Sequence, residues 1–299
     1  MDDLPVSATR STDPYLEHRP HLLGVAYRIL GSFAEAEDVA QEVWLRWDAA
    51  EPGSIERPRA WLVTVTTRLA LDRLRRAKAR RETYVGPWLP EPVRTGPDIA
   101  EQVERADTVS LAMLVVLESL SPLERAVFVL HEAFGYGHAE VAEILGRTEP
   151  AVRQLLKRAR GHVTAARPRY DTDRHTRREA TERFLRACLS GDVQALLEVL
   201  APDVRLVSDT GGQGKAPLRI IAGMDKVARF FVAIAQQPVP DQRIEFTDVN
   251  GVPGMIAFSG AEPKYVAVLN TRDGRVVDIV LTANPDKLAG VLAAAGRLA

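Results

Sequence analysis

Two segments of the sequence concentrate basic side chains, which can hold phosphate groups and read the bases of nucleic acids. Residues Arg68–Arg81 contain seven Lys or Arg and one acid, and residues Arg147–Arg169 contain seven and one as well. The whole chain nevertheless has a formal net charge of only −1. Because charge gathered in this way creates a directed field, two such segments on separate folding units predict two footprints on one polyanion.

The second basic segment also has the pattern of a helix–turn–helix. His138–Leu145 predicts a short helix, Gly146 allows a tight turn, and a second helix follows Thr148. In that second helix an apolar stripe lies opposite a polar face, as a reader of the DNA major groove requires. The polar face consists of Glu149, Arg153, Gln154, Lys157 and Arg160.

We expect Arg153 to reach guanine edges, and Lys157 and Arg160 to contact phosphates. The alternative is a solvated surface helix whose charges do nothing specific. A run of charge alone would favour that alternative. The helix cap, the glycine turn and the two-faced pattern together favour DNA binding.

The carboxy-terminal part of the chain carries the only candidates for catalysis. Asp209 could act as a lone base, and Gly211, Gly212 and Gly214 beside it could cradle an anion. However, residues 176–299 contain no His, no Trp and one Tyr, and no strand–glycine loop–helix pattern follows. A carboxylate in a loop or an interface is therefore the preferred role for Asp209. We expect that the chain is not an enzyme and that it has no catalytic residues, no cofactor and no metal site.

A chain of 299 residues exceeds the usual size of one domain, so the elements that position these residues are expected to belong to several domains. We expect a helical domain over 10–82, a proline-rich linker over 83–105, a helix–turn–helix domain over 106–168 and an α+β domain over 172–299. Local signals include an N-cap at Asp13, a helix stop at Gly31 and a capping box at Ser121. The last domain reads as helices and six strands in a mostly antiparallel sheet.

The composition is that of a soluble globular protein, with 46% hydrophobic and 26% charged residues. No apolar run approaches the roughly 18 residues that span a bilayer, and the acidic N-terminus lacks a signal-peptide pattern. The single cysteine, Cys188, rules out an internal disulfide. We expect a cytoplasmic location.

Three segments together resemble the extracytoplasmic-function sigma factors of bacterial RNA polymerase. AEDVAQEVWLRW (36–47) is similar to region 2.2, AWLVTVTTRLALDRLRR (60–76) to regions 2.3 and 2.4, and residues 121–163 to region 4. The resemblance implies that the chain is a monomer when free and binds core polymerase, at the β′ clamp and the β flap, and promoter DNA.

The resemblance also implies a role for each segment. The 36–47 segment would bind polymerase through Glu37, Asp38, Gln41, Glu42 and Trp44. The long helix would meet the promoter −10 element through Thr64, Thr67, Arg68, Arg73, Arg75 and Arg76. The helix–turn–helix would read the −35 element. Asp72 is expected to pair within its own helix, and Trp47 to lie mostly in the core.

The extension after residue 170 resembles SnoaL-like domains, cone-shaped α+β folds of the nuclear-transport-factor-two type. Three motifs are typical of sigma factors with such an extension: Trp88-Leu89-Pro90-Glu91-Pro92, Asp209 to Lys215, and Asn284-Pro285-Asp286-Lys287-Leu288. The middle motif departs from the family pattern because its glycines are interrupted and its lysine is displaced. The resemblance implies an intramolecular modulator whose motifs contact each other or the sigma domains.

Two other functions remain open from the residues. One is a stand-alone DNA-binding regulator that does not bind core polymerase. The other is a sigma module gated by a tail that binds an unknown small ligand or is weakly catalytic. A test of binding to core polymerase distinguishes the stand-alone regulator from a sigma factor. A ligand-dependent shift in the stability of the tail would indicate the gated module.

Overall fold

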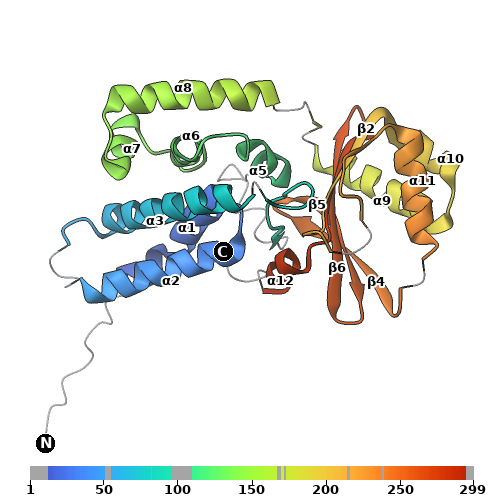
Figure 1. Ribbon diagram of the computed structural model, residues 1–299, viewed down its shortest axis with the longest axis horizontal. Coiled ribbons are helices and arrows are strands. Elements are labelled where there is room, and N and C mark those ends of the chain that lie inside the picture. The colour runs from blue at the N-terminus through green and yellow to red at the C-terminus, as the bar shows by residue number, and fades with distance from the viewer. Residues whose placement is uncertain are drawn as a thin grey trace, which may run out of the picture.

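The computed structural model describes residues 13–50, 55–81, 83–95, 110–166, 170–171, 173–213, 216–237 and 239–293. Figure 1 shows a helical half built from the N-terminal part of the chain and a half built on a curved sheet. Segments from the middle and the end of the chain lie between these halves.

The N-terminal helical domain consists of α1 (Pro14–Leu30), α2 (Phe33–Ala49) and α3 (Pro58–Arg81). Asp13 Oδ1 accepts from Tyr15 N at 2.9 Å and so caps α1. Gly31 ends α1 in the left-handed conformation, with φ 73°, which glycine adopts without steric cost. Both signals are as the sequence predicts.

The second helical domain contains α5 (Leu111–Leu117), α6 (Pro122–Phe128), a π-helical turn η2 (Val129–Ala133), α7 (His138–Leu145) and α8 (Glu149–Ala166). The predicted capping box is present, because the Ser121 hydroxyl accepts from Glu124 N while the Glu124 carboxylate accepts from Ser121 N. Gly146, with φ 61°, makes the turn between α7 and α8. A helix–turn–helix is therefore in place.

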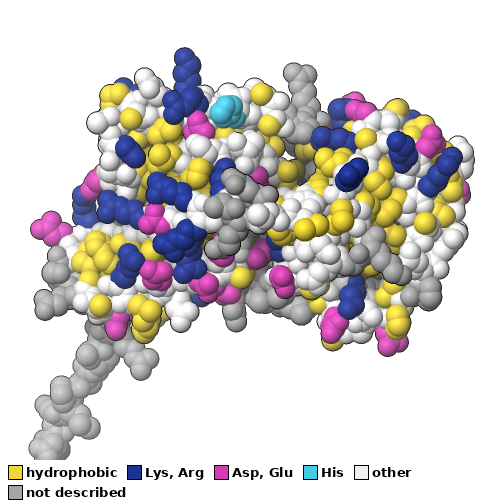
Figure 2. All heavy atoms as spheres, viewed as in Figure 1, with side chains coloured by type: hydrophobic (Ala, Val, Ile, Leu, Met, Phe, Trp, Pro, Cys, Tyr) yellow, Lys and Arg dark blue, Asp and Glu magenta, His cyan; other side chains and the backbone are white. Residues whose placement is uncertain are grey.

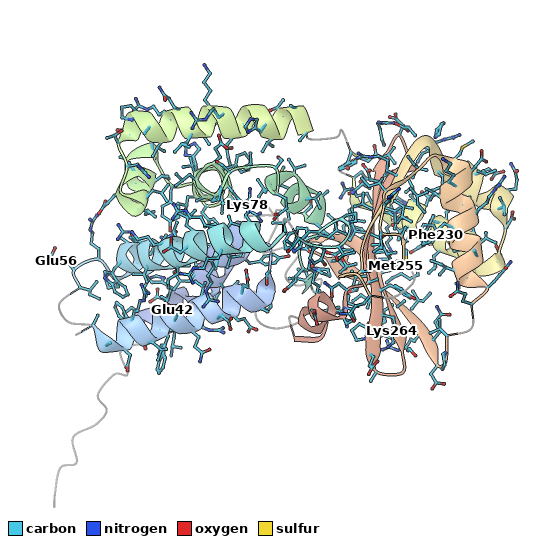
Figure 3. All side chains as sticks on the ribbon, in the orientation of Figure 1. Glu42, Glu56, Lys78, Phe230, Met255 and Lys264 are labelled. Carbon is cyan, nitrogen blue, oxygen red and sulfur yellow. The ribbon has the colours of Figure 1, made fainter. Side chains whose placement is uncertain are left out.

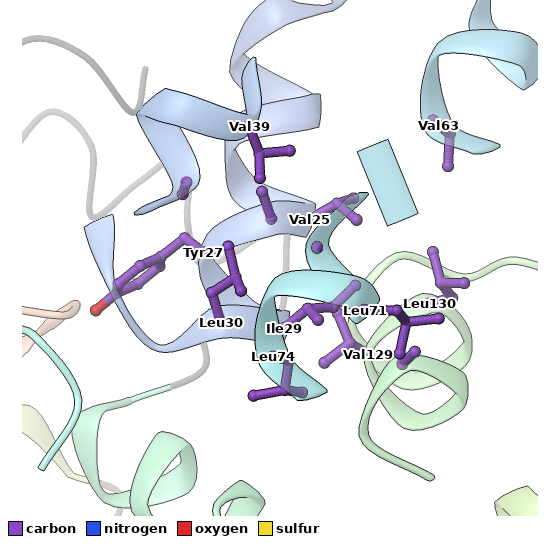
Figure 4. Packing of buried hydrophobic residues seen from close by; sticks show 14 of the residues in the cluster. Val25, Tyr27, Ile29, Leu30, Val39, Val63, Leu71, Leu74, Val129 and Leu130 are labelled. Carbon is purple, nitrogen blue, oxygen red and sulfur yellow. The ribbon is translucent and has the colours of Figure 1, made fainter. Parts of the chain in front are cut away.

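The two helical domains share one hydrophobic core. Figure 4 shows Val129 and Leu130 of η2 packed close to Leu71 of α3 and Ile29 of α1. All four side chains are fully buried. The helix–turn–helix is consequently docked on the first domain and does not stand apart from it.

The C-terminal domain wraps helices around a curved sheet. Its helices are α9 (Arg174–Ser190), α10 (Val193–Val199), α11 (Met224–Ala235) and α12 (Pro285–Ala293). Its strands are β2 (Leu200–Asp209), β3 (Ile221–Ala222), β4 (Gln242–Val249), β5 (Val252–Ser259), β6 (Glu262–Arg272) and β7 (Arg275–Thr282). The expected α+β cone fold is confirmed. The sheet is mixed, since β2 runs parallel to β7 and the other pairs are antiparallel.

A strand from the segment between the helical domains completes this sheet. We name Thr83–Thr95 the linker segment; its last two residues form β1 (Arg94–Thr95), which pairs with β4. The strand order is β1-β4-β5-β6-β7-β2-β3. The sequence predicts a separate linker over 83–105 and gives no sign of this pairing. Residues 96–105 of that linker lie outside the described residues.

The sheet has a different apolar cluster on each face. On the side of α9 and α11, Phe184, Leu206 and Leu269 lie in one cluster. On the opposite side, α12 packs on Val268 and Val280 together with Leu89 of the linker segment and Leu111 of α5. This second cluster joins the C-terminal domain to the rest of the chain.

Candidate DNA-binding and interdomain interfaces

The outer face of α8 presents the residues predicted to read duplex DNA. Val152, Leu156, Ala159 and Val163 are buried on one side, while Arg153, Gln154 and Lys157 are exposed on the other. Two of the exposed arginines are paired: Arg153 with Glu149 of its own helix, and Arg160 with Glu132 of η2 at 2.6 Å. Such exposed pairs are weak and can exchange for phosphates.

The residues predicted to meet the −10 element do not share one face of α3. Arg68, Arg75 and Arg76 are exposed, and Arg75 pairs with Asp72 at 2.8 Å as expected. Thr64 is half-buried, with its hydroxyl donating to Ala60 O at 2.8 Å. Thr67 is fully buried, so it has no exposed atom to offer DNA in this conformation.

The acidic face of α2 is partly open to solvent, and two of its carboxylates pair with an arginine of α3. Asp38, Gln41 and Trp44 reach solvent, and Glu37 and Glu42 are half-buried. Arg73 of α3, predicted as a DNA contact, pairs instead with Asp38 and Glu42. Trp47 is 3% exposed in the core, whereas Trp44 is 39% exposed. Figure 2 shows Lys and Arg with interspersed Asp and Glu over the helical half of the molecule.

Glu91 of the linker segment caps the N-terminus of α2. Its carboxylate accepts from Ser32 Oγ at 2.8 Å, Phe33 N at 2.6 Å and Ala34 N at 3.1 Å. The unpaired amides and the positive end of the helix dipole favour a carboxylate there. Burial raises the pKa of Glu91, and these donors oppose that rise. The linker segment is thereby fixed to the N-terminal domain.

Asp209 fixes the same segment to the C-terminal domain. The Asp209 carboxylate is fully buried and accepts from Leu89 N at 2.8 Å, from the Tyr84 hydroxyl and from Lys287 Nζ at 2.6 Å. Lys287 Nζ also donates to Leu89 O at 2.6 Å and lies 3.9 Å from the centre of the Trp88 ring. Asp209 is therefore a structural carboxylate, placed at an interface. Lys215, predicted beside it, lies outside the described residues.

The helix start at Asn284 completes this contact. Asn284 Oδ1 accepts from Asp286 N at 3.0 Å, and its amide donates to the Tyr84 hydroxyl at 2.9 Å. Tyr84, whose pKa is raised by burial and by the Asp209 carboxylate, is a residue that the sequence analysis misses. A hollow of about 270 Å³ remains here, lined by residues of α2, α3, the linker segment and α12.

Tyr27 and Asn250 form a third buried contact that the sequence analysis misses. The Tyr27 hydroxyl donates to Glu91 O at 2.7 Å and accepts from the Asn250 amide at 2.7 Å. Asn250 also accepts from Val93 N at 3.0 Å. Asn250 is recognisable only as a hairpin residue, and it does occupy that turn with φ 52°. One residue of each outer domain thus meets the linker segment at a single point.

The second helical domain covers the start of α3. Arg57 pairs with Glu143 of α7 at 2.6 Å, and His21 Nε2 lies 2.9 Å from the Tyr136 hydroxyl. Residues of α1, α3 and α7 line a groove of about 650 Å³ here, which Thr64 also borders. Deeper in the contact, the fully buried Arg125 donates from Nε to Arg28 O at 3.1 Å and pairs with Glu118.

Other kinds of site are not evident in the described part of the chain. Across the residues that the structure describes, no group of three His, Cys, Asp or Glu side chains could hold a metal ion. Among the helices of those residues, none has the length and apolar character needed to cross a bilayer.

Comparisons with known proteins match this architecture in order. The family model of Sigma-70 region 2 matches residues 15–80, that of Sigma-70 region 4 matches 110–163, and that of the SnoaL-like domain matches 181–283. The ECF RNA polymerase sigma factor SigJ of Mycobacterium tuberculosis is 42% identical over 286 residues, which cover 91% of each chain. The chain belongs to the ECF RNA polymerase sigma factors. Its helix–turn–helix is the region 4 domain, and α1–α3 form the region 2 domain.

One further relative and a solved structure of SigJ support the assignment over nearly the full length of this sigma factor. The probable ECF sigma factor SigI of M. tuberculosis is 33% identical over 290 residues, covering 95% of each chain. The crystal structure of M. tuberculosis SigJ has a TM-score of 0.73 and 38% identity, covering 92% of this chain and 97% of that one. The SnoaL-like extension is therefore a shared part of this architecture.

Proposed function

We propose that this sigma factor binds core RNA polymerase and directs it to promoters whose −10 and −35 elements are read by α3 and α8. The acidic face of α2 would bind the β′ clamp, and the region 4 domain would bind the β flap. The SnoaL-like domain would act as an intramolecular modulator. One observation carries this last part: the linker segment is bound by both outer domains, through Glu91 and Asp209.

The packing of the region 2 and region 4 domains supports the proposal. Elements 25 base pairs apart are separated by roughly 85 Å along B-DNA, at 3.4 Å per base pair. Two domains that share one core cannot contact both elements at once. In addition, α7 lies beside the start of the −10 helix, where Glu143 pairs with Arg57 and Thr64 borders the groove between them. The conformation described is therefore a closed state that must open for initiation.

The bound linker segment limits how far the domains can separate. Residues 82–109 could span at most about 95 Å when extended, at roughly 3.4 Å per residue. While Thr83–Thr95 stays bound, only residues 96–109 remain as a tether, which spans at most about 50 Å. Release of the linker segment thus sets the reach of the region 4 domain.

We further propose that the SnoaL-like domain has no catalytic activity. The observation behind this is the burial of Asp209, which pairs with Lys287 and leaves no carboxylate oxygen for a substrate. A polymerase subunit acts on the chromosome, so the proposal also places the protein in the cytoplasm.

The test is run-off transcription with purified core polymerase on a candidate promoter. We expect the full-length protein to support transcription and a chain truncated after Ala283 to change its level by several-fold. Lys287→Ala, which removes the ammonium that binds Asp209 and Leu89 O, should shift activity in the same direction. Equal activity of all three proteins would remove the modulator role. A chain that binds promoter DNA but not core polymerase would be a stand-alone regulator.

A further inference from the structure

Arg73 lies in the seam between α2 and α3. Its guanidinium donates from Nη1 to Asp38 Oδ2 at 3.1 Å and from Nη2 to Glu42 Oε2 at 3.4 Å. The side chain is 26% exposed, compared with 50% for Arg75 two residues later. Figure 3 shows Glu42 on α2 beside α3. Arg73 therefore points to the acidic helix.

Helical geometry separates Arg73 from Arg68 and Arg75. Arg68 and Arg75 are seven residues apart, so they lie on nearly the same face, and both are exposed. Arg73 is displaced from Arg75 by two residues, or about 200° around the helix axis. It shares with Glu42, Arg46 and its helical neighbour Arg76 the lining of a hollow of about 330 Å³ between the two helices. A phosphate bound on the Arg68–Arg75 face would be out of its reach.

The two carboxylates that Arg73 holds are one turn apart on α2. A planar guanidinium has several donors in a fixed arrangement, so it can set the spacing of two acceptors as an ammonium cannot. Glu42 is also bound by Arg46 at 2.8 Å, which extends the row to three ion pairs. Asp38 remains 65% exposed, so its carboxylate is still open to a basic partner from the solvent side.

We infer that Arg73 is a positioning residue for core polymerase binding and not a contact of the −10 element. The inference rests on the proposed role of the α2 face. Arg73 binds the carboxylates of Asp38 and Glu42 from the side of α3. It thereby orients them for a basic partner that binds from the solvent side. Side chains ordered before binding lose less rotamer freedom in the complex, and the gain is seen mainly in slower dissociation.

The test uses the full-length chain and purified core polymerase, with dissociation kinetics and the affinity of the assembled holoenzyme for a −10 single-strand oligonucleotide. For Arg73→Ala we expect dissociation from core to become about 5- to 10-fold faster, with DNA affinity within about twofold of the wild type. Arg75→Ala removes one positive charge from the same helix but not from the seam. It should show the opposite result, weaker DNA binding and an unchanged rate of dissociation from core.

Two further variants separate positioning from charge and from loss of fold. Arg73→Lys keeps the charge and should still dissociate faster than the wild type, because an ammonium lacks the rigid fork of donors that fixes the spacing of the two carboxylates. In an Asp38→Asn/Glu42→Gln background, Arg73→Ala should have no added effect on core binding. Additive effects, a wild-type rate for Arg73→Lys, or lost DNA affinity with unchanged core dissociation would each overturn the inference. Failure of the wild-type chain to bind core would instead reject the proposed function.

Discussion

Lys287 Nζ lies 2.6 Å from Asp209 Oδ2, and both side chains are almost completely removed from solvent. The two residues are 78 positions apart in the sequence of the SnoaL-like domain, and the main chain of Leu89 completes their hydrogen bonds. A buried ion pair adds little stability compared with an apolar pair, but the loss of one partner leaves an uncompensated charge. The contact therefore makes binding of the linker segment sensitive to either residue.

Asp209→Asn should release the linker segment. It leaves the Lys287 ammonium buried without its anion, which costs about 3 to 5 kcal/mol for a typical buried pair. We expect faster hydrogen exchange at Tyr84–Leu89 and a lower melting temperature. Asp209→Asn/Lys287→Met should recover part of the stability, since neither partner is then charged. Equal protection of the segment in the wild type and the single variant would contradict this account.

Glu91→Gln should loosen the linker segment from the region 2 domain. The amide of glutamine has one acceptor oxygen, whereas the Glu91 carboxylate uses both of its oxygens to accept from three donors, and the amide brings no charge to the N-terminus of α2. The expected loss is about 1 to 3 kcal/mol in the free energy of unfolding. Chemical denaturation measures it. Glu179→Gln, a change of the same kind at an exposed position of α9, should stay close to the wild type.

Glu143→Arg should open the contact between the region 2 and region 4 domains. The ion pair itself is exposed and weak, so its loss alone changes stability little. The new arginine, however, faces Arg57 and repels it. With Cys188 replaced by Ala, fluorophores on Gln41→Cys and Thr164→Cys should report a longer distance between the domains. Glu182→Arg in α9 makes the same charge change far from the contact, and it should leave the distance unaltered.

Acid should weaken the same contact through His21. Burial and the nearby Arg59, His18 and Arg28 lower its pKa to about 4, so the folded state keeps the ring neutral. The unfolded chain takes up a proton near pH 6.5 and the folded state does not, so stability falls as the pH drops from about 6.5 to about 4. His21→Gln should flatten this part of the curve of melting temperature against pH. An unchanged slope would assign the acid sensitivity to other groups.

The helices and their ends were predictable because their signals are local. Asp13, Gly31 and Ser121 act on residues within one turn, and the apolar stripe of α8 repeats along a single helix. The resemblance to sigma factors supplied the rest of the domain order. The fold and the family were therefore within reach of the sequence.

Long-range contacts were beyond the sequence. The pairing of β1 with β4 joins Arg94 to Val249, and Tyr27 meets Asn250 across 223 residues. Likewise, the helical pattern shows that Arg73 is basic but not that Asp38 and Glu42 lie beside it. Thr67 looks polar and accessible, yet the docked helices bury it. Only the tertiary packing distinguishes these cases.

The β1–β4 pairing has a consequence for newly made chains. Thr95 leaves the ribosome long before its partner Asp248, and Leu89 is made 198 residues before Lys287. At about 5 to 20 residues per second, the interval between Leu89 and Lys287 lasts roughly 10 to 40 s. The region 2 and region 4 helices can fold during that interval, and Glu91 can already bind the start of α2. The groups of the SnoaL-like domain that hold the linker segment do not yet exist. The contacts between the linker segment and the SnoaL-like domain thus form only after that domain has been translated, later than the docking of region 2 on region 4.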